Sequence, residues 1–147
     1  GGCGLAAICD ITFAVPEAKF GYTEVKIGFL PAIVSVFLLR KIGEARTKQL
    51  LLSGDVVSAQ AALDLGLITF LAPAETLADT VRTYAQRLCR ENSGQSMELT
   101  KEMLAHLPEL DLEEALRYAA QRNAVQRGAD DCRRGIGAFL NKEKIMW

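Results

Sequence analysis

The sequence predicts an α/β fold in which strands and glycine-rich turns occupy the first third of the chain and helices occupy the rest. The 147 residues are 50% hydrophobic and 24% charged, a composition typical of a globular domain. Short β-branched and aromatic runs lie in the first 71 residues, whereas later segments carry apolar residues at helical spacing. A few short strands do not close a sheet by themselves. We therefore expect earlier strands to be missing from this sequence, which opens inside a glycine turn.

The first third combines turns with two expected strands. Gly1–Gly4 is typical of a tight turn or of a close backbone approach, and residues 5–9 of a buried helical turn. Residues 11–15 and 18–22 are rich in β-branched and aromatic side chains, as buried strands are. From residue 23 the chain is expected to enter a loop that its glycine and proline keep irregular.

Helices are expected over most of the remaining chain, interrupted by one short strand at 67–71. Gly43 is predicted to separate the first two helices and Ser58 to cap the third. Residues 92–95 are predicted to be a linker. The expected helices span 32–41, 44–52, 59–65, 75–90, 96–106, 111–127 and a last segment that Asp130 or Asp131 caps and that runs to about 144.

The net charge, the hydropathy and the cysteine positions exclude some classes of partner and compartment. With 17 Lys and Arg against 18 Asp and Glu, the net charge of −1 argues against a nucleic acid partner. The sequence has no run of 18 apolar residues, so a membrane partner is not expected either. The four cysteines, Cys3, Cys9, Cys89 and Cys132, are far apart and form no CxxC pair, which favours a reduced, cytoplasmic protein.

The common catalytic motifs are absent from the sequence. The single histidine, His106, lies near an expected helix end, so a nucleophile–histidine relay has no second candidate. Cys3 fits a small buried cysteine better than a nucleophile, and Cys132 lacks enough neighbouring ligands for a metal site. A phosphate-binding loop of the GxGxxG or P-loop type is also missing.

A series of short motifs along the first 68 residues is more informative. These motifs are GGCGLA at 1–6, Cys9-Asp10, AKFG at 18–21, Glu24, Ile27-Gly28, Pro31, Gly43, LSG at 52–54 and the 59–68 segment with Ala59, Ala62 and Gly66. In this order and spacing they resemble the enoyl-CoA hydratase/isomerase (crotonase) family. The resemblance covers the whole chain and is densest over residues 1–72.

The resemblance implies a crotonase-like spiral of ββα units followed by a C-terminal helical trimerisation region, with the N-terminal units missing. Residues 1–72 would then be the C-terminal part of the core, and residues 73–147 a helical oligomerisation region that builds homotrimers or hexamers. The implied substrate is an acyl thioester of coenzyme A. No metal or other cofactor is implied, because coenzyme A arrives as part of the substrate.

The resemblance also assigns roles to particular residues. Gly1 would donate its main-chain N–H to the thioester oxyanion, and Glu24 would be the general acid and base. Gly2 and Pro31 would contact substrate. Two further substrate-binding positions near the C-terminus, often supplied by a neighbouring subunit, would meet the adenine and phosphate of coenzyme A; they are Phe139 and Lys142.

Two departures from the family pattern leave the reaction open. Many hydratases carry a second glutamate three residues after the oxyanion glycine, where this chain has Gly4, and residues 32–34 are Ala-Ile-Val where many members have glycines. The first reading is a hydratase-like lyase, with the 23–29 string similar to members that act on branched, methylglutaconyl-type substrates. The alternatives are an isomerase that uses Glu24 alone and a non-catalytic acyl-CoA-binding or oligomerisation homologue. The 147 residues alone are expected to be inactive.

Overall fold

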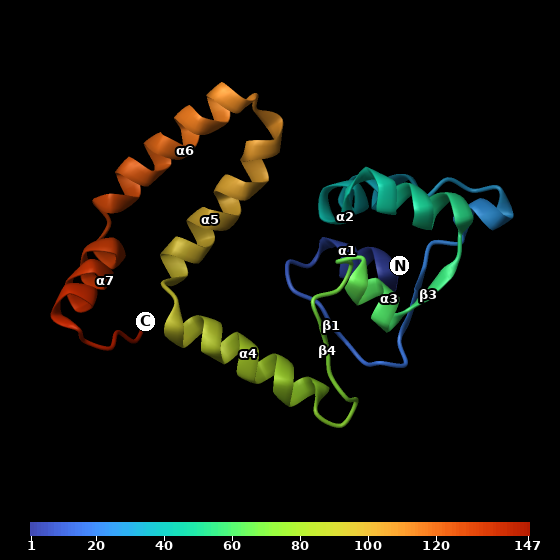
Figure 1. Ribbon diagram of the computed structural model, residues 1–147, viewed down its shortest axis with the longest axis horizontal. Coiled ribbons are helices and arrows are strands. Elements are labelled where there is room, and N and C mark those ends of the chain that lie inside the picture. The colour runs from blue at the N-terminus through green and yellow to red at the C-terminus, as the bar shows by residue number, and fades with distance from the viewer. The chain divides into compact units, whose positions relative to one another are not determined.

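The computed structural model describes all residues from Gly1 to Trp147 (Figure 1). The chain divides into two compact units, Gly1–Arg82 and Thr83–Trp147. In chain order the elements are α1 (Gly2–Ile8), β1 (Phe13–Ala14), β2 (Lys19–Gly21), the 3-10 helix η1 (Glu24–Ile27), α2 (Ala32–Ser53), β3 (Val56–Ser58), α3 (Ala59–Asp64), β4 (Phe70–Leu71), α4 (Leu77–Glu91), α5 (Gly94–His106), the 3-10 helix η2 (Leu107–Glu109), α6 (Leu112–Arg127) and α7 (Asp130–Asn141).

The strands of the first unit form two separate pairs. β1 runs parallel to β4, with Phe13 opposite Phe70, and the two rings lie 4.9 Å apart between centroids. β2 runs antiparallel to β3, with Phe20 opposite Val57. The sequence analysis did not predict β3, because three residues between a helix end and a helix cap are too short to show an alternating pattern. Ser58 ends this strand and caps α3, as predicted, with its Oγ accepting from the Ala61 N–H at 3.2 Å.

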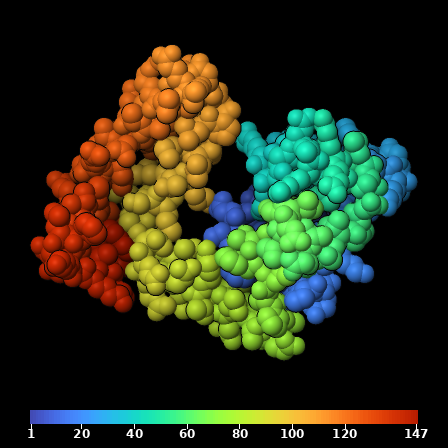
Figure 2. Space-filling model, viewed as in Figure 1, coloured from blue at the N-terminus to red at the C-terminus, as the bar shows by residue number.

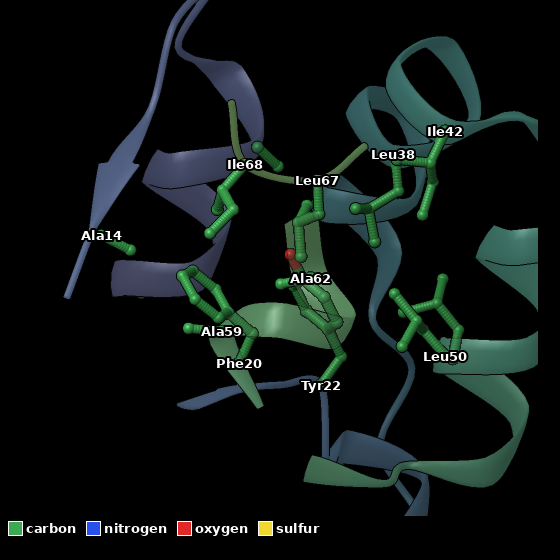
Figure 3. Close-up of a cluster of buried hydrophobic side chains, with 12 residues drawn as sticks. Ala14, Phe20, Tyr22, Leu38, Ile42, Leu50, Ala59, Ala62, Leu67 and Ile68 are labelled. Atoms are coloured by element: carbon green, nitrogen blue, oxygen red, sulfur yellow. The ribbon is translucent and has the colours of Figure 1, made fainter. Parts of the chain in front are cut away.

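The core of the first unit lies where α2 and α3 meet the strand pairs (Figure 3). Leu38 of α2 and Leu67 after α3 are fully buried. Ala59 and Ala62 of α3 are equally inaccessible, and their small side chains allow α3 to approach Phe20 of β2 closely. Each fully buried leucine contributes about 2 kcal/mol relative to an exposed one. The core thus ties the helices to the strand that leads into η1.

The long helix α2 consists of two segments. Gly43 has φ 76° and ψ 172° within it, a conformation that side-chain-bearing residues rarely adopt. The prediction that Gly43 separates two helices is therefore confirmed. Gly54 then ends α2 in the left-handed conformation, with φ 62°.

Two expectations for the first third are wrong. Gly2–Gly4 are helical rather than a tight turn, since they form the first turn of α1, and the Leu5 N–H donates to the Gly1 oxygen at 3.1 Å. Glycine disfavours helices intrinsically, so tertiary contacts decide the conformation here. The expected irregular loop after residue 23 begins instead with the 3-10 turn η1, which Gly28 closes at φ 73°.

The second unit is helical, with α5 and α6 side by side (Figures 1 and 2). Arg122 of α6 donates to Glu102 of α5 at 2.9 Å. Asp111 caps α6 in a capping box with Glu114, which confirms the predicted start of this helix. Across the whole chain, none of the helices is both long and apolar enough to cross a membrane.

Three further predictions for the second unit need correction. Residues 92–95 are not a linker, because Ser93 caps α5, is 5% exposed and donates to Asp131. Asp130 and Asp131 do not cap α7 but lie in its first turn, after the N-cap Ala129. The last helix ends at Asn141 rather than near 144. The division into a core part, residues 1–72, and an oligomerisation region, residues 73–147, remains a prediction.

Candidate active site

A pocket of about 640 Å³ lies among the residues of α1, η1 and the start of α2. Much of its wall is apolar, with Leu5 and Ile8 of α1, Ile33 and Phe37 of α2, and Phe29 after η1. Glu24 supplies the only carboxylate among the lining residues. A mainly apolar cavity with one convergent charged group is the usual form of a small-molecule site.

The Glu24 side chain enters this pocket from the first residue of η1. Its main-chain oxygen accepts from the Phe29 N–H at 2.9 Å, so the turn that presents it is closed by the backbone. The carboxylate oxygen Oε2 is shielded from solvent and has no hydrogen-bond partner. A buried acceptor left without a partner is unfavourable by about 1–3 kcal/mol. Glu24 is therefore the lining residue of this pocket whose ionisable side chain has an unsatisfied oxygen.

Two glycines hold η1 in place through close contacts. A Cβ on Gly21, at the end of β2, would lie 3.0 Å from Val56 Cγ2, so only glycine allows β3 to approach β2 this closely. A Cβ on Gly54 would lie 3.0 Å from Val25 Cγ2, so the end of α2 packs directly on η1. The position of Glu24 is thus set by β2 on one side and by α2 on the other.

Three glycines at the N-terminal end of α1 also line the pocket. Gly1 and Gly2 are exposed, and a Cβ on either would meet no atom within 4 Å. Gly4 also lines the pocket, and its Cβ would lie 3.9 Å from Val34 Cγ2. Because these residues lack side chains, a ligand can approach the backbone at the N-terminal turn of α1.

Long side chains from other elements fix α1. The Tyr22 hydroxyl donates to the Cys3 oxygen at 3.1 Å, in the first turn. The Lys41 ammonium, from α2, donates to the Ala6 oxygen at 3.1 Å and to the Cys9 oxygen at 2.7 Å, at the C-terminal end. Both ends of this seven-residue helix are therefore anchored to the rest of the unit.

The structure brings four of the predicted site residues to one pocket: Gly1, Gly2, Glu24 and Pro31 all line it. The other two belong to the second unit. Phe139 of α7 is 82% exposed, and Lys142 ends α7 in the left-handed conformation, with φ 58°. In the described chain, 1–147, no group of three or more His, Cys, Asp and Glu side chains is placed to hold a metal ion.

Tyr22 also lines this pocket, although its sequence context did not indicate this. Tyr22 is the last residue of the expected strand 18–22, and aromatic residues in strands are usually core side chains. The one feature of the sequence that could have indicated a place in the pocket is its position two residues before Glu24.

Comparisons with known proteins define the class of fold first. The crystal structure of an enoyl-CoA hydratase from Mycobacterium smegmatis superposes with a TM-score of 0.91 at 26% identity, covering 99% of this chain and 56% of that one. The predicted crotonase-like fold class is thereby confirmed. The model of the enoyl-CoA hydratase/isomerase family matches residues 1–147, and the chain belongs to this family.

Individual relatives agree with the family match. A Thermus thermophilus protein named "Putative enoyl-CoA hydratase" is 44% identical over 142 residues, which are 97% of this chain and 56% of the relative. The crotonyl-CoA hydratase of Syntrophomonas wolfei is 33% identical, over 98% of this chain and 55% of the relative. The chain thus spans little more than half the length of these relatives.

Proposed function

We propose that the complete protein containing these residues is an enoyl-CoA hydratase-like lyase. It adds water across the 2,3 double bond of an enoyl thioester of coenzyme A, with Glu24 as acid and base and Gly1 as one carbonyl donor. The observation that carries the proposal is the unpartnered, solvent-shielded Oε2 of Glu24, a residue that lines the same pocket as Gly1 and Gly2.

The residues in the pocket account for a balanced addition. The thioester oxygen accepts from the Gly1 main-chain N–H, and this polarisation makes C3 electrophilic. The Glu24 carboxylate takes a proton from water as the water oxygen bonds to C3, and the double-bond electrons move to the thioester as an enolate. The enolate then takes that proton back at C2 from the Glu24 carboxylic acid. One carboxylate thus serves both transfers, and no proton is gained or lost.

The acyl group is proposed to be branched, of the methylglutaconyl type. The apolar wall beside Glu24, including Ile33 and Val34, supports a substrate with a carbon branch near the reacting atoms. Gly4 has no side chain beside Val34, which leaves further room in this part of the pocket.

An isomerase is the second candidate, and one observation favours it. Glu24 is the only carboxylate among the lining residues of the pocket. A single carboxylate suffices to carry a proton between two carbons of the acyl chain, because the proton that it removes is the one that it returns.

A third candidate is a non-catalytic subunit that binds acyl-CoA or assembles the oligomer.

For each of these three candidate functions, we propose a homotrimer or hexamer built through residues 73–147. Exposed apolar side chains in the second unit support this assembly: Leu112, Leu116, Val125, Phe139 and Leu140. Phe139 and Lys142 would then meet the coenzyme A of a neighbouring subunit. Sedimentation equilibrium tests the assembly, and a monomeric mass would contradict it.

The proposed cytoplasmic setting rests on the cysteines. All four are free thiols, as is usual in a reducing compartment.

The complete protein should be assayed with crotonyl-CoA, methylglutaconyl-CoA and a 3-enoyl-CoA. Water uptake by either of the first two, seen as loss of enoyl absorbance and a mass gain of one water, supports the lyase. Migration of the double bond in the third without mass change supports the isomerase. Binding of all three without turnover contradicts both enzymes and supports the binding subunit.

The 147 residues alone are proposed to turn over none of these substrates. The resemblance to the family places a second carbonyl donor in a turn outside these residues. Since each such donor lowers the barrier by about 3 kcal/mol, its absence removes a large part of the carbonyl stabilisation. Turnover by the isolated chain in the same assay would contradict this proposal.

A further inference from the structure

Tyr22 is a buried titratable side chain that the proposed reaction does not use. It follows β2 directly, is 3% exposed, and packs in the core with Phe20 of β2 and Ala62 of α3 (Figure 3). A phenol buried in apolar surroundings needs a partner for its hydroxyl. That partner is the main-chain oxygen of Cys3, 3.1 Å away.

This hydrogen bond joins the two segments that carry the proposed chemistry. Tyr22 lies two residues before Glu24, and Cys3 lies in the first turn of α1, two residues after Gly1. All four residues line the same pocket. A movement of the Tyr22 hydroxyl relative to α1 therefore changes the separation between the Glu24 carboxylate and the Gly1 nitrogen.

The hydroxyl of Tyr22 remains a donor up to strongly alkaline pH. Burial raises the pKa of Tyr22 from 10.0 to about 12, and the neighbouring Cys3 and Glu24 contribute in the same direction. Ionisation would place a phenolate near these groups in an apolar environment, which is unfavourable. The neutral form, which donates to the Cys3 oxygen, is therefore retained.

We propose that Tyr22 is a positioning residue of this active site. Its hydroxyl holds the first turn of α1 at a fixed separation from Glu24, so that the main-chain donor and the carboxylate meet the same bound thioester. The inference rests on the proposed function. It gives Tyr22 no contact with the reacting atoms, and its effect comes from the sensitivity of the rate to displacements of about 1 Å.

The test is Tyr22→Phe in the complete protein, which removes only the hydroxyl and keeps the ring in the core. We expect kcat to fall about tenfold with KM within about twofold of wild type, because a misplaced carboxylate raises the barrier by about 1.4 kcal/mol, the equivalent of a tenfold rate change. The matched control is Tyr118→Phe in α6, which should leave both constants unchanged. A kcat for Tyr22→Phe equal to that of the control overturns the inference.

A double variant separates positioning from a general structural role. If Tyr22 acts by placing the Glu24 carboxylate, Tyr22→Phe added to Glu24→Gln lowers the residual rate by less than about twofold, because coupled effects are not additive. If the double variant instead loses rate by the product of the two single-variant losses, the inference is overturned. Full activity of Glu24→Gln alone removes the proposed function itself, whereas a slow Glu24→Gln with a normal Tyr22→Phe removes only the role of Tyr22.

A second substitution covers the case in which Tyr22→Phe does not fold. 3-Fluorotyrosine, incorporated at position 22 alone, keeps the ring and the donor but lowers the phenol pKa. Cys3 from α1 and Glu24 from η1 are the titratable groups beside it in both proteins. The alkaline decline of kcat should begin at a lower pH than in wild type, and an unchanged decline overturns the inference.

Discussion

A buried oxygen without a hydrogen-bond partner indicates function only when its surroundings do so as well. The first unit has two such oxygens, Glu24 Oε2 and Thr47 Oγ1. Thr47 carries a neutral hydroxyl and lines a different pocket, of about 510 Å³. Glu24 is ionisable and shares its pocket with the open backbone of Gly1 and Gly2, which is why it, and not Thr47, is the proposed acid and base.

The raised pKa of Tyr22 predicts a pH dependence of stability. The folded pKa, about 12, lies above the unfolded value of about 10, so the contribution of the neutral phenol is complete below pH 10 and disappears as the pH rises to 12. The difference in unfolding free energy between wild type and Tyr22→Phe should therefore shrink by roughly 2 kcal/mol across this window. Denaturant titrations of both proteins at several alkaline pH values measure it.

Absorbance of the phenolate provides the check on this prediction. The chain has three tyrosines, and the step that ionises last should be missing from Tyr22→Phe. A late step that persists in the variant would show that another tyrosine carries the high pKa.

At the same scale, sequence reasoning found part of the candidate site. The register of the family motifs led to Gly1, Gly2, Glu24 and Pro31, which share a pocket in the structure. It did not lead to Tyr22, because the bond from its hydroxyl to Cys3 spans 19 residues of sequence and depends on how β2 packs under α1. The roles of all these residues remain predictions.

Among the elements, those fixed by local chemistry were predictable. Gly43 separates the two segments of α2, and Ser58 and Asp111 cap the helices that follow them. A helical turn was expected at residues 5–9, but the start of α1 at Gly2 was not, because its first turn holds glycines that disfavour helices. Its conformation depends on distant side chains, and the sequence around it carries no sign of them.

Lys41 is predicted to be the main support of the C-terminal end of α1. Its ammonium donates to the main-chain oxygens of Ala6 and Cys9. Lys41→Met keeps the aliphatic stem and removes both charged hydrogen bonds, so we expect a loss of about 2 kcal/mol in unfolding free energy. Chemical denaturation of the complete protein measures this loss.

The matched control for Lys41 lies on the same helix. Lys48 forms an exposed pair with Glu44 one turn away, and Lys48→Met should change stability by less than about 0.5 kcal/mol. Equal losses in the two variants would contradict the assigned support of α1.

For the whole molecule, the crotonase class was predictable because several motifs agree in order along one chain. Local patterns alone predicted only strands and turns in the first third and helices in the rest of the chain. They did not predict how the strands pair, because β1 and β4 have two residues each and lie more than fifty residues apart. The second unit, Thr83–Trp147, leaves many apolar side chains exposed. Their cover in the proposed oligomer remains a prediction, because no contact within one chain specifies it.

The central claim, that one glutamate exchanges protons with a thioester held by main-chain donors, is tested most directly by Glu24→Gln in the complete protein. The variant keeps the shape of the side chain and removes its capacity as a base. We predict that kcat for the substrate that wild type hydrates falls by roughly a hundredfold or more. Glu17→Gln, at an exposed turn outside the pocket, should keep the wild-type rate. A Glu24→Gln variant as fast as Glu17→Gln would contradict the account.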